Sequence, residues 1–259
     1  MAITLTTDFG TRDGFVAQMK GVILGINPSA RLIDVTHDVR PFAVLEAALV
    51  LKGIARYFPA GTIHVAVVDP GVGSTRRCVA VLSEGRIYVG PDNGLFSLVM
   101  PPSSTAEVRE IRNPDFILPD AHPTFHGRDI FAPVAAHLSL GKPMRLVGPQ
   151  VDDPVRLALP VALRTPEGIQ GEVIYRDRFG NLSTNIEATM LGRQAREIVC
   201  ANVRLSGIKR CFQEVPEGEP LALLNSFGLL EIAVNRGDAS AILGIAVGDR
   251  VTVKWECIT

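Results

Sequence analysis

Hydrophobic residues in the first part of the chain recur at two alternating spacings. Short apolar or β-branched runs occupy residues 3–7, 31–36 and 62–68. Between them, residues 13–28 and 41–58 carry apolar side chains every three to four positions, and each segment stops at or before a proline. The first spacing predicts strands, and the second predicts amphipathic helices that end at these prolines.

The same alternation continues to about residue 160. We expect further strands at residues 78–82, 87–89 and 108–111, followed by a helix at 130–140. The run at 62–68 is almost wholly apolar, as expected for a strand buried on both faces of a sheet. This βαβα order predicts an α/β fold with a mainly parallel, layered sheet.

After Pro160 the pattern changes to short runs of alternating residues separated by glycines and turn residues. The expected strands lie within residues 171–177, 181–186, 201–207, 221–226, 229–235 and 249–255. Short strands at close intervals are typical of a small antiparallel barrel or sandwich. We therefore predict an α/β domain at residues 1–160, a proline-containing linker within 148–168, and a smaller all-β barrel domain at 168–259.

Composition limits the partners and the compartment. The formal net charge of −1 argues against nucleic acid or an anionic membrane as a general partner. The N-terminus lacks the layout of a signal peptide, and no apolar run approaches the ~20 residues that span a bilayer. We expect a soluble cytoplasmic protein. Cys78, Cys200, Cys211 and Cys257 lie far apart, which argues against a zinc site or a dense disulfide framework.

Polar residues follow several of the expected strands. Asp8, Asp69 and the pair Asp92-Asn93 stand in glycine-containing turns. One such turn alone indicates only turn chemistry. Because the carboxyl ends of parallel strands meet at one edge of a sheet, the three turns together favour a ligand pocket at that edge.

The segment VVDPGVGSTRR, residues 67–77, raises the alternative of a phosphate-binding loop. No Lys-Ser/Thr pair follows Gly73, and the glycine spacing does not complete GxGxxG. Strand-like residues resume at Arg77, so no helix N-terminus is offered to a phosphate. We expect instead that the glycines turn the chain so that Arg76 returns toward Asp69.

Another polar segment, HPTFHGRDIFAP at residues 122–133, stands just ahead of a predicted helix. His126 precedes Gly127 in an accessible position for an imidazole. A helix-capping region with a surface histidine explains the segment equally well. His37, His64 and His137 lie within or beside apolar elements, and we interpret them as structural.

Two turns of the second domain concentrate polar and aromatic residues. The first turn contains Asp177, Phe179 and Asn181. It is either a simple hairpin turn or a site of ligand contact. The second combines amide, hydroxyl, aromatic and carboxylate side chains at Asn225, Ser226, Phe227, Glu231 and Asn235. Exposed phenylalanine beside amides suits a flat heteroaromatic ligand that needs both stacking and edge hydrogen bonds.

Five segments, in the order TTDFGTRDGFVAQMKG, VVDPGVGSTRR, GPDNGLF, PTFHGRD and DRFGNLSTNI, resemble the S-adenosyl-L-methionine (SAM) hydroxide adenosyltransferase family. These SAM hydrolases are related to fluorinases and chlorinases, and the resemblance covers essentially the whole chain. It implies an N-terminal α/β domain, a C-terminal β-barrel and a homotrimer. It also implies active sites between the N-domain of one subunit and the C-domain of the next, with SAM as the substrate and no cofactor or metal.

The resemblance assigns roles to individual residues. Asp69, Arg76 and His126 match the family's catalytic set, and Asp8 matches the acid that binds the ribose hydroxyls. The substrate-binding residues expected from the resemblance and from the turns above are Asp8, Asp13, Phe42, Asn93, Asp177, Phe179, Asn181, Ser226, Glu231, Val234, Asn235 and Arg236. In the family, the aromatic at Phe42 lies against the nucleoside, Ser226 and Asp13 match methionine-side contacts, and residues 234–236 match the backbone that reads the adenine edge.

Two departures from the halogenases bear on the reaction. Halogenases carry Tyr-Pro where this chain has Asp69-Pro70, and fluorinases carry serine where it has Gly127. Where halogenases have a halide pocket, this chain has an acid, an arginine and a histidine, which can bind and activate a water molecule. The resemblance therefore implies hydrolysis of SAM to adenosine and L-methionine by in-line attack of an activated water on C5′. The alternatives are an adenosine or SAM sensor without turnover, a weak SAM-dependent halogenase, and a purely structural trimer.

Overall fold

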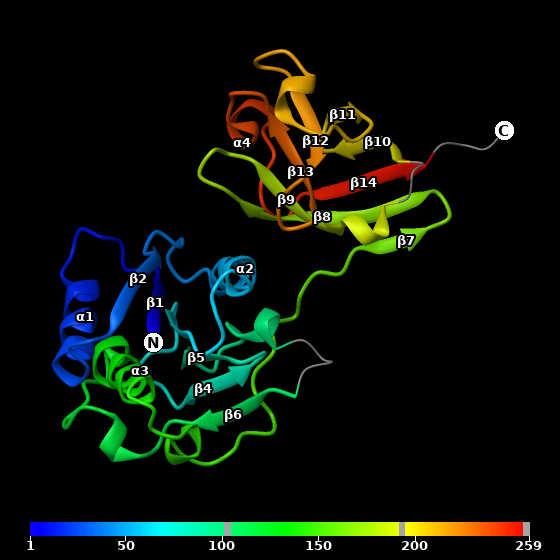
Figure 1. Cartoon of the computed structure of the whole chain (residues 1–259). Helices are drawn as coiled ribbons and strands as arrows, with labels where there is room; N and C mark the ends of the chain where they lie inside the picture. Colours follow the sequence, from blue (N-terminus) through cyan, green and yellow to red (C-terminus); the bar gives the residue numbers. More distant parts are fainter. Residues whose placement is uncertain (101–104, 192–194, 256–259) are drawn as a thin grey trace. The chain divides into compact units, whose positions relative to one another are not determined.

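The computed structural model describes residues 1–100, 105–191 and 195–255 of the chain. The chain divides into two compact units, Met1–Leu157 and Ala158–Thr259 (Figure 1). No helix within the described residues is long and apolar enough to cross a membrane.

The first unit is a sheet with helices on both faces. Its elements are β1 (Ala2–Thr7), α1 (Phe15–Ile26), β2 (Arg31–Thr36), α2 (Val44–Ala55), β3 (Ile63–Val67), β4 (Cys78–Ser83), β5 (Arg86–Pro91), β6 (Glu107–Glu110), a π-helical turn (Gly127–Phe131) and α3 (Ala132–Ser139). The strand order is β2-β1-β3-β5-β4-β6. The alternation of strand and helix predicted from residue spacing is confirmed for β1 through β3: α1 connects the parallel neighbours β1 and β2, and α2 leads from β2 to β3 on the other side of β1.

The expectation of a mainly parallel sheet needs correction at one edge. β2, β1, β3 and β5 pair in parallel, whereas β4 runs antiparallel to both β5 and β6, so the sheet is mixed. Glu84 and Gly85, between β4 and β5, have positive φ angles of 49° and 73°. Consecutive residues with positive φ form the tight hairpin turn that joins antiparallel strands, whereas parallel neighbours need a long crossover.

Helices cover both faces of this sheet. Side chains of α1 and α3 pack with Ile3, Leu5 and Val65 in one core, and α2 packs with Ala66 and Tyr88 in another. Alternate residues of β3 therefore contribute to opposite cores, and the whole strand is buried as its apolar sequence predicts. Because Thr7 pairs with Val67, the residues after β1 and β3 emerge side by side at the same edge.

The second unit is a nearly closed antiparallel barrel, as predicted. Its elements are β7 (Leu163–Thr165), β8 (Gly168–Arg176), β9 (Leu182–Glu187), β10 (Ala195–Cys200), β11 (Val203–Ser206), β12 (Pro220–Leu224), β13 (Leu229–Val234), α4 (Ala239–Leu243) and β14 (Arg250–Trp255). The main path runs β11-β10-β14-β8-β9-β13-β12. A bridge between Lys209 and Leu223 brings the two ends of this path together. The alternating runs in the sequence did not indicate β7, β10 or the short helix α4, whose N-terminus is capped by Asp238.

Candidate active site

The loop after β3 carries an acid and an arginine that face each other. The chain leaves β3 at Asp69 and turns through hydrogen bonds from Val72 N–H to the Asp69 carbonyl and from Ser74 N–H to the Gly71 carbonyl. Gly73 has φ +76°, and a Cβ there would lie 2.6 Å from a backbone oxygen, that of Pro123. Only glycine fits this conformation and this close approach. The turn brings Arg76 back toward Asp69, as expected from the glycine spacing.

Asp69 and Arg76 form a buried, bidentate ion pair. The Arg76 Nε–H donates to Asp69 Oδ1 at 3.0 Å, and Nη2 donates to Asp69 Oδ2. Their side chains are only 5% and 9% exposed. A guanidinium that donates two parallel bonds to a carboxylate fixes the orientation of both groups.

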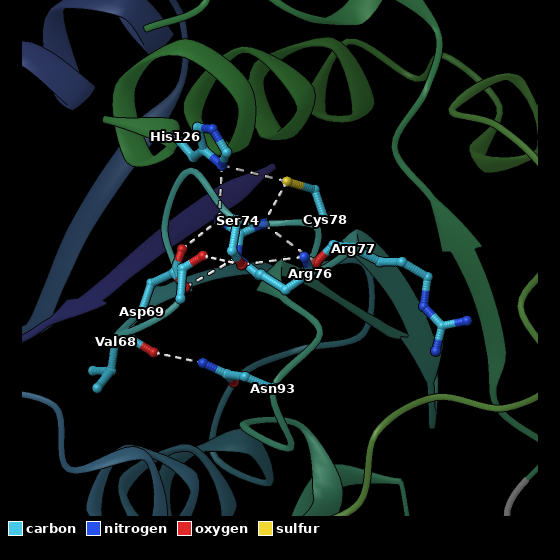
Figure 2. Close-up of polar contacts among 9 residues, drawn as sticks. Val68, Asp69, Ser74, Arg76, Arg77, Cys78, Asn93 and His126 are labelled. Carbon is cyan, nitrogen blue, oxygen red and sulfur yellow. Dashed lines mark hydrogen bonds and ion pairs between the residues drawn. The ribbon is translucent and has the colours of Figure 1, made fainter. Parts of the chain in front are cut away.

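His126 joins this pair from the other side of the loop. Arg76 Nη2 also lies 2.7 Å from His126 Nδ1 (Figure 2). Arginine has donors and no acceptor, so His126 Nδ1 must accept, and the ring is neutral with its proton on Nε2. Burial lowers the pKa of His126 below its ordinary value of 6.5, and the positive charge of Arg76 lowers it further, against smaller opposing effects of Asp69 and Asp129.

A π-helical turn directly follows His126. Asp129 accepts the His122 backbone N–H at 2.9 Å and pairs with Arg128, so the cluster of acid and arginine next to His126 is internally satisfied. π-helical turns are rare and are frequent at functional sites. His126 stands at the N-cap of this turn but makes no side-chain capping bond, and its ring contacts Arg76 instead.

Asp69 and His126 border a pocket of about 330 Å³ within the first unit, and Arg76 lies behind them without lining it. Its lining combines the strand-end acids with aromatic and apolar side chains and consists of Asp8, Phe9, Phe15, Pro41, Phe42, Val67, Asp69, Val72, Thr124, Phe125, His126 and Gly127. Asp8 and Asp69 meet here because β1 and β3 are parallel neighbours. A pocket is therefore present at the edge of the sheet where the sequence predicts one, lined by Asp8 and Asp69 but not by Asp92 or Asn93.

Phe42 forms part of the pocket rim in a strained conformation. Its φ is +66°, which is rare for a bulky residue, and the residue is 70% exposed. The Phe42 N–H donates to Asp8 Oδ2 at 2.9 Å, so this bond holds the strained backbone and orients the carboxylate. Strain of this kind gathers at ligand sites.

Aromatic rings crowd the position at which fluorinases carry serine. A Cβ at Gly127 would lie 3.2 Å from the Phe125 ring and 3.3 Å from the sulfur of Met19. The rings of Phe9, Phe15 and Phe125 pack edge to face with centroids 5.4–5.9 Å apart. A side chain at residue 127 would require these neighbours to shift by a few tenths of an ångström.

Two of the expected contact residues lie away from this pocket. Asn93 donates its amide to the Val68 carbonyl at 2.9 Å and accepts the Leu95 N–H, so it stabilises its own turn. Its neighbour Asp92 pairs with Arg77. Asp13 is exposed in the bend ahead of α1. A polar residue after a strand can thus close a turn rather than face the ligand.

In the second unit, the predicted residues gather at a separate hollow of about 980 Å³. Among its lining residues are Phe179, Asn181, Val234, Asn235 and Arg236. Asp177 does not line it but accepts the N–H groups of Phe179 and Asn181 and the Asn181 amide, and so sets the shape of the turn. The hollow also contains residues that the sequence did not indicate, namely Cys211, Phe212, Gln213, Val215, Glu217, Gly237 and Asp238.

Glu231 lies in β13 among polar partners instead of in this hollow. Its Oε2 accepts from the Ser183 hydroxyl at 3.1 Å and from the Asn225 amide at 3.0 Å. Burial raises the pKa of the Glu231 carboxyl, against these two hydrogen bonds. Ser226 follows Asn225 in the turn between β12 and β13.

The remaining histidines and the cysteines form no second cluster among the described residues. His64 is fully buried, bonds Thr4 and stacks on Tyr88, and burial lowers its pKa to about 4. The described residues hold no group of histidine, cysteine, aspartate and glutamate side chains arranged for a metal ion. Cys78, Cys200 and Cys211 are free thiols, and Cys257 lies outside the described residues. Only Cys78 among these three touches the Asp69 pair, through Arg76.

Comparisons with known proteins cover nearly the whole chain. Family models described as the SAM hydroxide adenosyltransferase N-terminal and C-terminal domains match residues 3–148 and 171–252. The chain is 44% identical to an "(R)-S-adenosyl-L-methionine hydrolase" of Thermus thermophilus, over 93% of this chain and 95% of the relative. A fluorinase of Actinopolyspora mzabensis is 31% identical over 97% and 96%. The crystal structure of an uncharacterized conserved protein from Thermotoga maritima matches with a TM-score of 0.91 and 37% identity, over 98% of this chain and 100% of that one.

Proposed function

This chain belongs to the SAM hydroxide adenosyltransferase family, and on that premise we propose that it hydrolyses SAM to adenosine and L-methionine. The observation that carries the proposal is the buried Asp69–Arg76–His126 cluster at the pocket, where halogenases have a tyrosine and a halide site. Because the Thermus relative is named for the (R) epimer at sulfur, we extend that stereochemistry to the substrate of this chain.

The proposed reaction is a displacement at C5′ of the ribose. The oxygen of water forms a bond to C5′ while the C5′–S bond breaks, and its electron pair leaves with the sulfur of methionine. The sulfonium is a good leaving group and needs no acid, so the barrier lies in the nucleophile and its alignment opposite sulfur. Water must give up one proton as the new bond forms.

Asp69 is the proposed proton acceptor. Arg76 occupies one lone pair of each Asp69 oxygen, and each oxygen keeps a second lone pair for water. His126 has its Nδ1 bonded to Arg76 and so presents Nε2–H, which donates to the water oxygen and directs its remaining lone pair toward C5′. Arg76 donates to Asp69 and His126, so in this proposal it aligns the two groups instead of binding hydroxide itself.

The aromatic wall supports this chemistry by excluding bulk water. Phe9, Phe15 and Phe125 form one side of the pocket, next to His126. The negative charge of the Asp69 carboxylate and the positive charge of the sulfonium are both lost as the proton moves to Asp69 and the C5′–S bond breaks, so charge becomes more dispersed in the transition state. A water-poor surrounding favours that change and strengthens the hydrogen bonds of the cluster.

We predict that kcat/KM falls as the pH is lowered, and that the midpoint of this acid limb of the pH profile lies below pH 6.5. Protonation of His126 at Nδ1 would place an N–H against an Arg76 N–H and break the contact between them. Burial and Arg76 hold the pKa of His126 below its ordinary value, so activity is retained at pH 6.5 and lost as pH falls further. Initial rates between pH 4.5 and 8 measure this, and a midpoint above 6.5 would contradict a neutral His126 bonded to Arg76.

Asparagine in place of Asp8 is expected to raise KM for SAM by about tenfold or more, with kcat changed by less than about threefold. The Asp8 carboxylate keeps one oxygen for the ribose diol after accepting the Phe42 N–H, and a charged acceptor is worth more than an amide. Asp38→Asn is the matched control, because Asp38 is an exposed acid that follows β2 outside the pocket. Equal effects of the two variants on KM would contradict a ribose-binding role for Asp8.

The second unit supplies the proposed contacts to adenine and methionine. Asn181, Asn235 and Arg236 offer amide, backbone and guanidinium groups at one hollow beside the exposed ring of Phe179. Arg236 has φ +57°, a second strained residue among the expected contacts. The homotrimer with active sites shared between subunits rests on the resemblance and remains a prediction, as does the cytoplasmic location.

The experiment that tests the proposal is incubation of SAM with the purified protein, followed by chromatography for adenosine and methionine. We expect both products in equal amounts, with the (R) epimer consumed faster. A nucleoside sensor would bind SAM without forming products. A halogenase would form a 5′-halo nucleoside when chloride or fluoride is added, and Asp69 at the position of the halogenase tyrosine argues against that outcome.

A further inference from the structure

We propose that Cys78 is a positioning residue that holds Arg76 and thereby fixes the tautomer of His126. The inference rests on the proposed hydrolysis of SAM and concerns a residue to which neither the motif pattern nor the resemblance assigned a role. Cys78 is the first residue of β4 and is 9% exposed. Its sulfur lies 2.8 Å from Arg76 Nη1 and 3.8 Å from His126 Nδ1 (Figure 2).

The contacts of Arg76 explain why this sulfur matters. Nε donates to Asp69, and Nη2 donates to Asp69 and His126. Nη1 donates to the Cys78 sulfur and, at the longer distance of 3.3 Å, to the Arg77 carbonyl. Among the described residues these contacts take up the five N–H groups of the guanidinium. Arg76 is therefore held by three side chains, the charged Asp69 and the neutral His126 and Cys78.

The guanidinium is planar, so the position of Nη1 determines where Nη2 lies. With Nη1 against Cys78, Nη2 reaches both Asp69 and the Nδ1 of His126. Without an acceptor at residue 78, Nη1 keeps only its longer bond to the Arg77 carbonyl, so the guanidinium and the Asp69 carboxylate can tilt together and lengthen the contact between Nη2 and Nδ1. His126 could then carry its proton on either nitrogen, and the Nε2–H donor proposed for the water would be present only part of the time.

The thiol is suited to this role and not to a covalent one. Burial raises the pKa of the Cys78 thiol above its ordinary value, although Arg76 opposes the shift. The sulfur is thus a neutral thiol at pH 7 and a poor nucleophile. With a neutral thiol at residue 78, Asp69 is the charged partner of Arg76. A thiolate would compete with Asp69 for the ion pair with Arg76.

The test compares Cys78→Ala, which removes the acceptor, with Cys78→Ser, which keeps one. We expect Cys78→Ala to lower kcat by about tenfold, or ~1.4 kcal/mol, with KM changed by less than about twofold. Cys78→Ser should retain most of kcat. Cys200→Ala is the matched control, because Cys200 is a buried free thiol in β10 of the second unit.

The pH profile separates positioning from packing. The groups that face His126 are Arg76, Asp69 and Cys78 across the loop, Asp129 on its own turn, and Asp8 across the pocket. Loosening Arg76 removes a cause of the lowered pKa of His126, so the acid limb of Cys78→Ala should move to higher pH. A loss of packing alone would lower the melting temperature without moving this limb.

A readout independent of turnover keeps the test valid even if SAM is not hydrolysed. In protein with ¹⁵N-labelled histidine, the His126 ring should give the Nε2–H pattern in wild type and Cys78→Ser, and an averaged pattern in Cys78→Ala. The proposal is overturned if Cys78→Ala keeps the wild-type ring shifts and acid limb. It is also overturned if the alanine and serine variants lose kcat equally and in proportion to their melting temperatures.

Discussion

Asparagine in place of Asp69 is expected to lower kcat by about 10²–10⁴-fold, the range for a lost general base, while adenosine affinity changes by less than about threefold. The substitution keeps the shape of the side chain but removes the charge that accepts the proton of water. Its NH₂ group would also face the N–H donors of Arg76, so the alignment of His126 weakens at the same time. Single-turnover rates with SAM and calorimetry with adenosine measure the two effects separately.

Asp92→Asn is the matched control for this prediction. Asp92 also follows a strand of the same sheet, is buried and pairs with an arginine, Arg77, but it does not line the pocket. Its carboxylate accepts the Val155 N–H at 2.9 Å, so the variant should have a lower melting temperature and a nearly unchanged kcat. If the two variants lose kcat and adenosine affinity alike, Asp69 serves folding or binding and not the chemical step.

Alanine in place of His126 is expected to lower kcat by about 10²-fold or more, with little change in adenosine affinity. The variant removes the Nε2–H donor and leaves an Arg76 N–H without its acceptor in a largely buried cluster. Because the ring donates to water and not to the nucleoside, the effect should appear in kcat and not in KM. The same kinetic and calorimetric measurements apply.

His122→Ala controls for changes in the loop itself. His122 lies in the same loop as His126, ahead of the π-helical turn, and is exposed. Its ring bonds Thr124, and it does not line the pocket. We expect its kcat to stay within about twofold of wild type. Retained turnover in His126→Ala would assign the donor role to another group.

Residue spacing predicted the layers of the fold because each buried face leaves a periodic apolar pattern. β3 shows this most clearly, since its side chains reach both cores and its sequence is apolar throughout. The direction of β4 was missed because pairing direction depends on the connection. Glu84-Gly85 is a two-residue turn that could have indicated a hairpin, but a strand-helix alternation upstream suggested parallel pairing.

The candidate site was predictable to the extent that its residues follow strands or motifs. Asp69 and Arg76 lie seven residues apart around the glycine turn that joins them, so their pairing follows from local sequence. Asn93 and Cys78 mark the limit of such reasoning. Asn93 stands after a strand like Asp69 yet closes its own turn, and Cys78, the first residue of β4, turns its sulfur toward Arg76. Side-chain direction at these residues depends on tertiary contacts that a motif does not encode.

The central claim, attack of water on C5′, is tested most directly by carrying out the reaction in H₂¹⁸O and analysing both products by mass spectrometry. We predict one ¹⁸O atom in the 5′-hydroxyl of adenosine and none in methionine. Adenosine without the label, a 5′-halo nucleoside in its place, or SAM recovered unchanged would contradict the claim.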